Sequence, residues 1–233
     1  MTQTRSGSSS WWRIAALTAL MAPLLLGAGV ARAQDADSTP AAEAPYYSDT
    51  EGPPQPGGVA NFLLYEDPDS LNPLVGQTSI AVQVSQAILE GLTYNDPDGV
   101  FQPGLAAELP TLENGGVSED LTTVTWKLKP DVLWSDGTPF TSADVRHTWE
   151  AARDAANGSA VASDYELITD IETPDPETAV VRYSAFNAGY LDQFPWIVPQ
   201  HATGAPEEMA NWDFNRAPIG TGPFVLQEWA PGE

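Results

Sequence analysis

The stretch from Trp126 to Glu150, WKLKPDVLWSDGTPFTSADVRHTWE, decides the fold of this chain. Just before and inside it, Val124, Trp126 and Leu128 alternate with polar side chains. Because side chains in a strand point alternately to opposite faces, this period of two predicts a half-buried strand over residues 121–128.

A tight turn and a helix are expected next. Ser135–Gly137 combines side-chain oxygens with a glycine that can take positive φ, which is typical of a turn. Thr141 or Ser142 can then cap a helix through its hydroxyl group. The apolar face of this helix is predicted from the spacing of Val145, Trp149 and Ala152.

The flanking sequence alternates between strand-like and helix-like segments, which indicates an α/β fold. Further strands are expected over residues 59–65, 92–94, 168–171, 179–183 and 224–229, and helices from Ser79 to a C-terminal glycine at Gly91 and over residues 186–194.

The first 33 residues have the features of a secretory signal peptide: arginines, an apolar run from Ile14 to Val30, and an A-x-A site, with cleavage expected after Ala33. A membrane anchor is the alternative, but Pro23 interrupts the run, which is shorter than the ~20 residues that a spanning helix needs. Residues 34–56 are rich in proline and acids and are expected to be a disordered leader. The domain is expected over residues 57–233.

Composition narrows the classes of function. The chain has no cysteine, which excludes disulfides, thiol catalysis and a lipidated cysteine as a membrane anchor. Removing residues 1–33 takes away three arginines and no acid, so the net charge moves from −23 to −26. We therefore expect no nucleic-acid partner and no stable membrane anchor, and export to the periplasm or the extracellular space.

Signatures of catalysis are also missing, since the chain contains no G-x-S-x-G elbow, P-loop or H-E-x-x-H motif. His147 is expected on a helix surface and His201 in a structural segment, so we predict no metal site, no cofactor and no enzymatic activity. Trp126, Trp134 and Trp149 fall on core positions, whereas Trp196 is expected to border a cleft.

The central stretch resembles the W-x-L-x-x-x-V-x-W-S-D-G-x-P-x-[TS]-A-x-D-V pattern of the family 5 extracellular solute-binding proteins, the peptide and nickel receptors of bacterial ABC importers. Two later segments are similar to segments of the same family, IVPQH at residues 197–201 and PIGTGPF at residues 218–224. Near Pro110 the chain departs from the family, which has a tryptophan there.

The resemblance implies a fold like that of the type 2 periplasmic binding proteins. Residues 57–233 would form the N-terminal part of the domain, which is lobe I with a small α/β subdomain inserted over about residues 76–163. Family members continue for about as long again, so we expect the second lobe to be missing and the chain to be truncated.

The resemblance also implies that this chain is the substrate-binding component of an ABC importer, which captures oligopeptides by closure of two lobes and docks on permease subunits. The residues expected to contact the ligand are Glu66, Asp67, Ser70, Leu71, Asn72, Tyr165 and Trp196. Nickel, haem or an oligosaccharide as the ligand, an exported fragment or scaffold without a ligand, and a secreted hydrolase remain alternatives.

Overall fold

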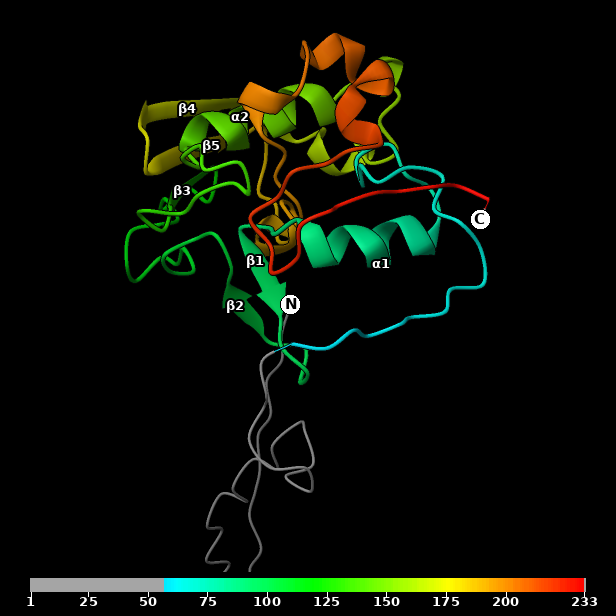
Figure 1. Cartoon of the computed structure of the whole chain (residues 1–233). Coiled ribbons are helices and arrows are strands. Elements are labelled where there is room, and N and C mark those ends of the chain that lie inside the picture. Colours follow the sequence, from blue (N-terminus) through cyan, green and yellow to red (C-terminus); the bar gives the residue numbers. More distant parts are fainter. Residues whose placement is uncertain (1–56, 233) are drawn as a thin grey trace, which may run out of the picture. The chain divides into compact units, whose positions relative to one another are not determined.

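The expected strand–turn–helix unit is present in the computed structural model, which describes residues 57–232 (Figure 1). Strand β3 spans Thr123–Lys127 and helix α2 spans Ser142–Ala152. Gly137 has a φ of +89° in the turn between them, as a glycine turn requires. The signal peptide and the leader expected over residues 1–56 lie outside the described residues.

Helix α2 begins at a carboxylate that has two partners. Thr141 is the N-cap residue, and its N–H donates to the Asp144 carboxylate at 2.8 Å. The second oxygen of Asp144 accepts the N–H of Gln200 at 2.8 Å. Because the carboxylate is buried, these charge-assisted bonds offset its desolvation and tie the helix start to the segment around Gln200.

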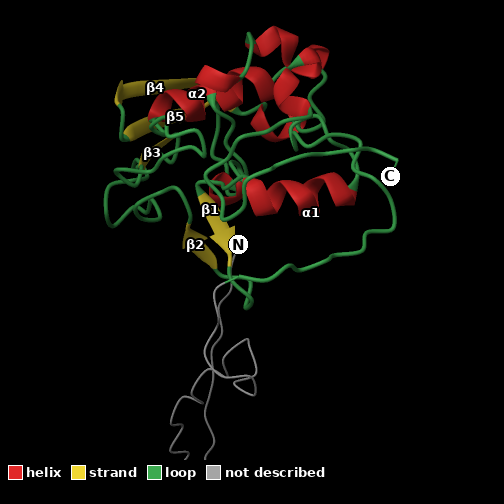
Figure 2. Cartoon of the chain, in the orientation of Figure 1, coloured by secondary structure: helices red, strands yellow, loops and turns green. Residues whose placement is uncertain are grey.

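β3 belongs to a three-stranded antiparallel sheet with the order β3-β5-β4 (Figure 2). β4 (Ile168–Asp175) and β5 (Thr178–Tyr183) form the expected hairpin, in which β4 is longer than predicted. Helix α2 contacts both of these strands. The core between them is made of buried apolar side chains that include Trp126, Val145, Trp149, Ile171 and Val181.

The tryptophans assigned to the core are buried as predicted, since Trp126, Trp134 and Trp149 expose at most 2% of their surface. The expectation for His147 is wrong. Only 4% of His147 is exposed, and its ring stacks on that of Trp212 with the centroids 5.5 Å apart. The segment around Trp212 therefore covers the face of α2 that the sequence pattern left open to solvent.

The hydrogen bonds of His147 indicate which of its ring nitrogens carries a proton. Its Nε2 atom lies 2.6 Å from the hydroxyl oxygen of Thr203. That hydroxyl donates to the Pro199 carbonyl at 2.8 Å, so it accepts from Nε2. The arrangement fits a neutral imidazole protonated on Nε2, and burial lowers the pKa of His147 below its ordinary value.

Helix α1 spans Ser79–Ile88, with Thr78 as its N-cap residue. It ends at Leu89, which is extended, so Gly91 is not the C′ residue that we expected. The C-terminal carbonyl groups are instead satisfied by a distant segment. Gly222 N–H donates to Ile88 O at 2.9 Å, and Phe224 N–H donates to Ala87 O at 3.1 Å.

Two predicted strands, over residues 59–65 and 224–229, are not formed. A strand needs a neighbour to exchange hydrogen bonds with, and no described segment pairs with either run. Phe62 and Phe224 are exposed, and the N–H of Phe224 is used by α1. The helix expected over residues 186–194 is reduced to a 3₁₀ turn, Tyr190–Asp192.

The remaining elements are short. β1 (Thr93–Asn95) and β2 (Phe101–Pro103) pair antiparallel. Other 3₁₀ turns cover Ala155–Asn157, Ala162–Tyr165, Gln200–Ala202, Pro206–Asn211 and Asp213–Asn215. The inserted subdomain stays a prediction, and its expected boundary near residue 163 falls between strands of one sheet. No helix between residues 57 and 232 is long and apolar enough to span a membrane.

Substitution of Gly220 is predicted to destabilise the fold, because a Cβ atom there would overlap the Ile88 carbonyl group. We expect Gly220→Ala to lower the free energy of unfolding by about 1–3 kcal/mol, the usual cost of overpacking. Gly189→Ala is the matched control, since the nearest atom to its added Cβ is 3.5 Å away. Urea unfolding measures both, and equal midpoints would contradict the prediction.

Because the imidazole of His147 is buried, we expect the stability of the fold to depend on pH. Because the pKa of folded His147 is lowered, the unfolded chain takes up this proton first as the pH falls below about 6.5. The free energy of unfolding should therefore fall between pH 7.5 and 5.5. In urea unfolding, His147→Gln should reduce this fall. An unchanged slope in His147→Gln would refute the assignment.

Candidate ligand-binding pocket

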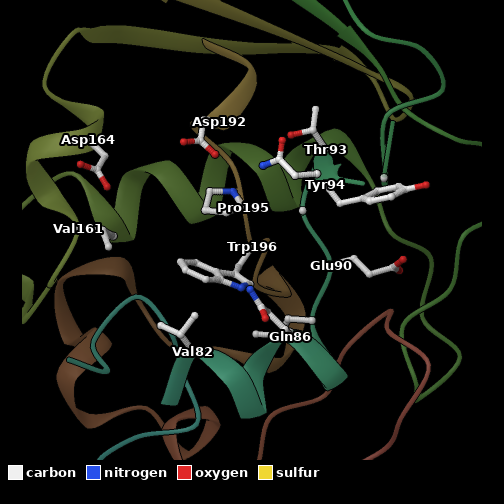
Figure 3. A pocket seen from close by; sticks show the side chains of 14 residues that line it. Val82, Gln86, Glu90, Thr93, Tyr94, Val161, Asp164, Asp192, Pro195 and Trp196 are labelled. Atoms are coloured by element: carbon white, nitrogen blue, oxygen red, sulfur yellow. The ribbon is translucent and has the colours of Figure 1, made fainter. Parts of the chain in front are cut away.

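A pocket of about 710 Å³ lies where the end of α1, strand β1 and the segment around Trp196 meet (Figure 3). Its wall is built on backbone hydrogen bonds. Leu92 N–H donates to Phe194 O at 2.9 Å, and Ile197 N–H donates to Glu90 O at 3.0 Å. These two bonds flank Trp196, so they fix the main chain that carries its indole.

Glycines allow the chain segments to approach this closely. A Cβ atom on Gly91 would overlap the carbonyl group of Phe194, and one on Gly104 would lie 2.5 Å from the oxygen of Gly91. Leu105 N–H reaches the same Gly91 oxygen at 2.8 Å. The pocket wall is therefore a place where main-chain segments pack directly against each other, and a side chain at either glycine would force them apart.

Trp196 provides the large aromatic surface of the pocket. It is half-buried. In Figure 3 its indole lies between Val82 and Gln86 of α1 and the side chains of Asp164 and Asp192. A partly exposed indole in a concave site offers both an apolar face and an N–H donor to a ligand. The expectation that Trp196 borders a cleft agrees with this position.

The charged side chains that line the pocket are all acidic, namely Glu90, Asp164 and Asp192. None of them makes an ion pair with another residue in the described part of the chain. Sequence reasoning did not single them out. In a chain with 32 acidic residues, no local pattern distinguishes these carboxylates from those on the surface.

Tyr165 lies in the core beside this pocket, not in its wall. Only 2% of it is exposed, and its ring packs edge-on against Phe194 with the centroids 5.5 Å apart. Burial raises the pKa of the Tyr165 phenol above its ordinary value. A solute in the pocket would meet its neighbour Asp164 instead, so substitution of Tyr165 would affect folding before binding.

The second half of the predicted binding loop is fixed inside the protein. Ser70, Leu71 and Asn72 are buried. Asn72 donates to the side-chain oxygen of Asn215 at 2.9 Å and accepts the N–H of Leu74 at 3.0 Å. Leu71 N–H donates to Asn215 O at 2.9 Å. In this structure, the polar groups of these residues anchor the loop.

The first half of the loop is exposed. Glu66 and Asp67 line a separate, shallower groove of about 530 Å³, together with Phe62, Leu226 and Trp229. The Asp67 carboxylate accepts the N–H of Gly232 at 2.8 Å. The predicted site residues are thus divided: Trp196 lines the pocket, while Glu66 and Asp67 lie on the groove.

The histidines do not form a metal centre in the part that the structure describes. No group of three or more His, Asp or Glu side chains between residues 57 and 232 could hold a metal ion. His201 lies 2.8 Å from the Asp136 carboxylate. The hydrogen bond from the Thr138 N–H lowers the pKa of Asp136 below its ordinary value, and the contact with His201 lowers it further. Both contacts are consistent with a role of Asp136 in holding the turn.

Comparison with known proteins identifies the family to which this architecture is similar. Residues 100–233 match the model of the bacterial extracellular solute-binding proteins, family 5, middle region. Protein XP55 of Streptomyces lividans is 33% identical over 171 residues, which cover 72% of this chain and 29% of that protein. The oligopeptide-binding protein OppA of Bacillus subtilis is 33% identical over 107 residues, covering 46% and 18% of the two chains.

Comparison with solved structures points to the same family. NikZ from Campylobacter jejuni, in complex with Ni(L-His), is similar with a TM-score of 0.63 and 26% identity, over 72% of this chain and 32% of that chain. The chain thus spans less than a third of the length of these relatives. The α/β fold is that of periplasmic binding proteins, and the chain belongs to the family 5 bacterial extracellular solute-binding proteins.

Proposed function

We propose that this chain supplies ligand-binding surface to the receptor of an ABC importer, which captures oligopeptides outside the cytoplasmic membrane and delivers them to permease subunits. The observation that carries the proposal is the pocket around Trp196 in a member of a solute-binding family. Its volume of about 710 Å³ lies within the range of small-molecule sites.

The chemistry of the pocket suits a peptide. The half-buried indole of Trp196 can pack on an apolar side chain or stack on a peptide plane. Thr93 and Asn95 line the same space, and the side-chain amide of Asn95 can offer hydrogen bonds to peptide groups. Capture would proceed by closure of a second lobe over this surface, so that affinity depends on both halves of the cleft.

Nickel is the second candidate ligand, because NikZ was solved with Ni(L-His). A nickel ion chelated by free histidine brings its own ligands and needs little direct coordination by protein. Titration of Ni(L-His) beside a neutral tripeptide separates the two proposals. Saturable binding of the chelate without binding of the peptide would favour nickel.

Removal of the indole should weaken binding of a tripeptide such as Ala-Lys-Ala to the full-length protein. We expect Trp196→Ala to raise the Kd about tenfold, because buried aromatic anchors often dominate binding energy. Isothermal titration calorimetry measures the change. The matched control is Phe186→Ala, an exposed aromatic residue that does not line the pocket. Equal Kd values for both variants would exclude the Trp196 site.

Substitution of Glu66 tests whether the exposed groove also takes part in binding. If the carboxylate faces a ligand amine, Glu66→Gln should raise the Kd of the same peptide about two- to fivefold, as expected for a solvent-exposed charge contact. Glu113→Gln, an exposed carboxylate outside this groove, serves as the control. An unchanged Kd in Glu66→Gln would remove the groove from the binding surface.

A further inference from the structure

The charge of the pocket indicates a class of solute. Three carboxylates line it, from Glu90 at the end of α1, Asp164 in a 3₁₀ turn and Asp192 in another. No lysine or arginine lines the pocket. Segments more than 100 residues apart in the chain thus bring side chains of one sign to a single concave site.

These carboxylates keep their acceptor capacity for a ligand. The carboxylates of Asp192 and Glu90 accept no hydrogen bond from any described residue, and the Asp164 carboxylate accepts one, from the neighbouring Ser163 hydroxyl at 3.4 Å. Two acids elsewhere in the fold are used internally instead. Asp144 accepts two backbone N–H groups, and Asp96 accepts two backbone N–H groups and the Gln102 amide.

The indole provides the complementary surface. In Figure 3, Asp164 and Asp192 lie above Trp196, whereas the Glu90 side chain lies to its right and extends away from the indole. An organic cation in this space could meet a carboxylate with its N–H donors and the face of Trp196 with its charge. A solute with a carboxylate in the same place would face like charges from several directions.

We propose that this pocket selects solutes with an organic cationic group, an ammonium or a guanidinium, over neutral and acidic ones. The proposal rests on the proposed receptor function and adds the class of substrate. The source of the cation in a peptide is either its free amino terminus or a lysine or arginine side chain. The net charge of −23 would also raise the local concentration of such solutes at low salt.

A series of tripeptides tests the selection on the full-length protein by isothermal titration calorimetry. Ala-Lys-Ala, Ala-Ala-Ala and Ala-Glu-Ala vary the side-chain charge. The acetylated forms of Ala-Lys-Ala and Ala-Ala-Ala, both with amidated C-termini, remove the terminal charges. We expect Ala-Lys-Ala to bind about tenfold or more tightly than Ala-Glu-Ala. If acetylation weakens the binding of Ala-Lys-Ala and of Ala-Ala-Ala to the same extent, the amino terminus is the recognised group. If acetylated Ala-Lys-Ala keeps its affinity, the side chain is.

A pair of isosteric substitutions links the preference to the pocket. The double variant Asp164→Asn, Asp192→Asn should reduce the advantage of Ala-Lys-Ala over acetylated and amidated Ala-Ala-Ala about fivefold or more. Glu119→Gln is the matched control, an exposed acid that does not line the pocket. Salt at 1 M, which shortens the Debye length to ~3 Å, should also narrow the preference.

The outcomes separate the two proposals. If acetylated and amidated Ala-Ala-Ala, which has no cationic group, binds as tightly as Ala-Lys-Ala, the selection for cations is refuted while the receptor function stands. If cationic peptides are preferred but the double variant keeps the full preference, the selectivity resides outside this pocket and the proposal is likewise refuted. If no peptide of the series binds, the oligopeptide receptor function itself fails.

Discussion

The structure depends on close packing of main chain against main chain around residues 87–92. Carbonyl groups of this segment accept N–H groups from three distant parts of the chain: from Gly222 and Phe224, from Ile197, and from Leu105. Each bond replaces water on a helix end or a loop that would otherwise carry unsatisfied polar groups. At this junction, the end of α1 is therefore stabilised by the segments around Ile197 and Gly222, which follow it by more than 100 residues.

Such packing restricts the residues that are allowed at the junction. Gly91, Gly104 and Gly220 all lie where a Cβ atom would collide with a carbonyl group of another segment. The requirement at these positions is space between two backbones and not a left-handed conformation. Gly137, by contrast, takes positive φ in a turn and has open space where a Cβ atom would lie. Two physical reasons for glycine therefore coexist in one chain and are distinguished only by their surroundings.

The same junction connects stability with the proposed binding. The bonds that hold residues 194–197 against the end of α1 also hold the indole of Trp196 at the pocket. The core formed by α2 and the sheet supports this arrangement from the other side, through Asp144 and its bond to Gln200. An aromatic anchor on a rigid segment loses little conformational entropy on binding, which is an advantage for a receptor. In the proposed receptor, the acidic side chains around that anchor would determine which solutes are accepted.

The sequence by itself determined the local elements of the fold and the family. The alternation around Trp126, the glycine turn at Gly137 and the capped helix with Val145 and Trp149 each depend on short-range periodicity, so they could be predicted. Only the tertiary structure decided the features that depend on contacts between residues far apart in the chain. Apolar runs at residues 59–65 and 224–229 have no paired neighbour strand, His147 is covered by Trp212, and Gly91 is a point of close approach. The pocket residues show the same contrast. The sequence predicted that Trp196 would border a cleft, because it falls on no core position. Glu90, Asp164 and Asp192 line the same pocket only because the chain folds back on itself.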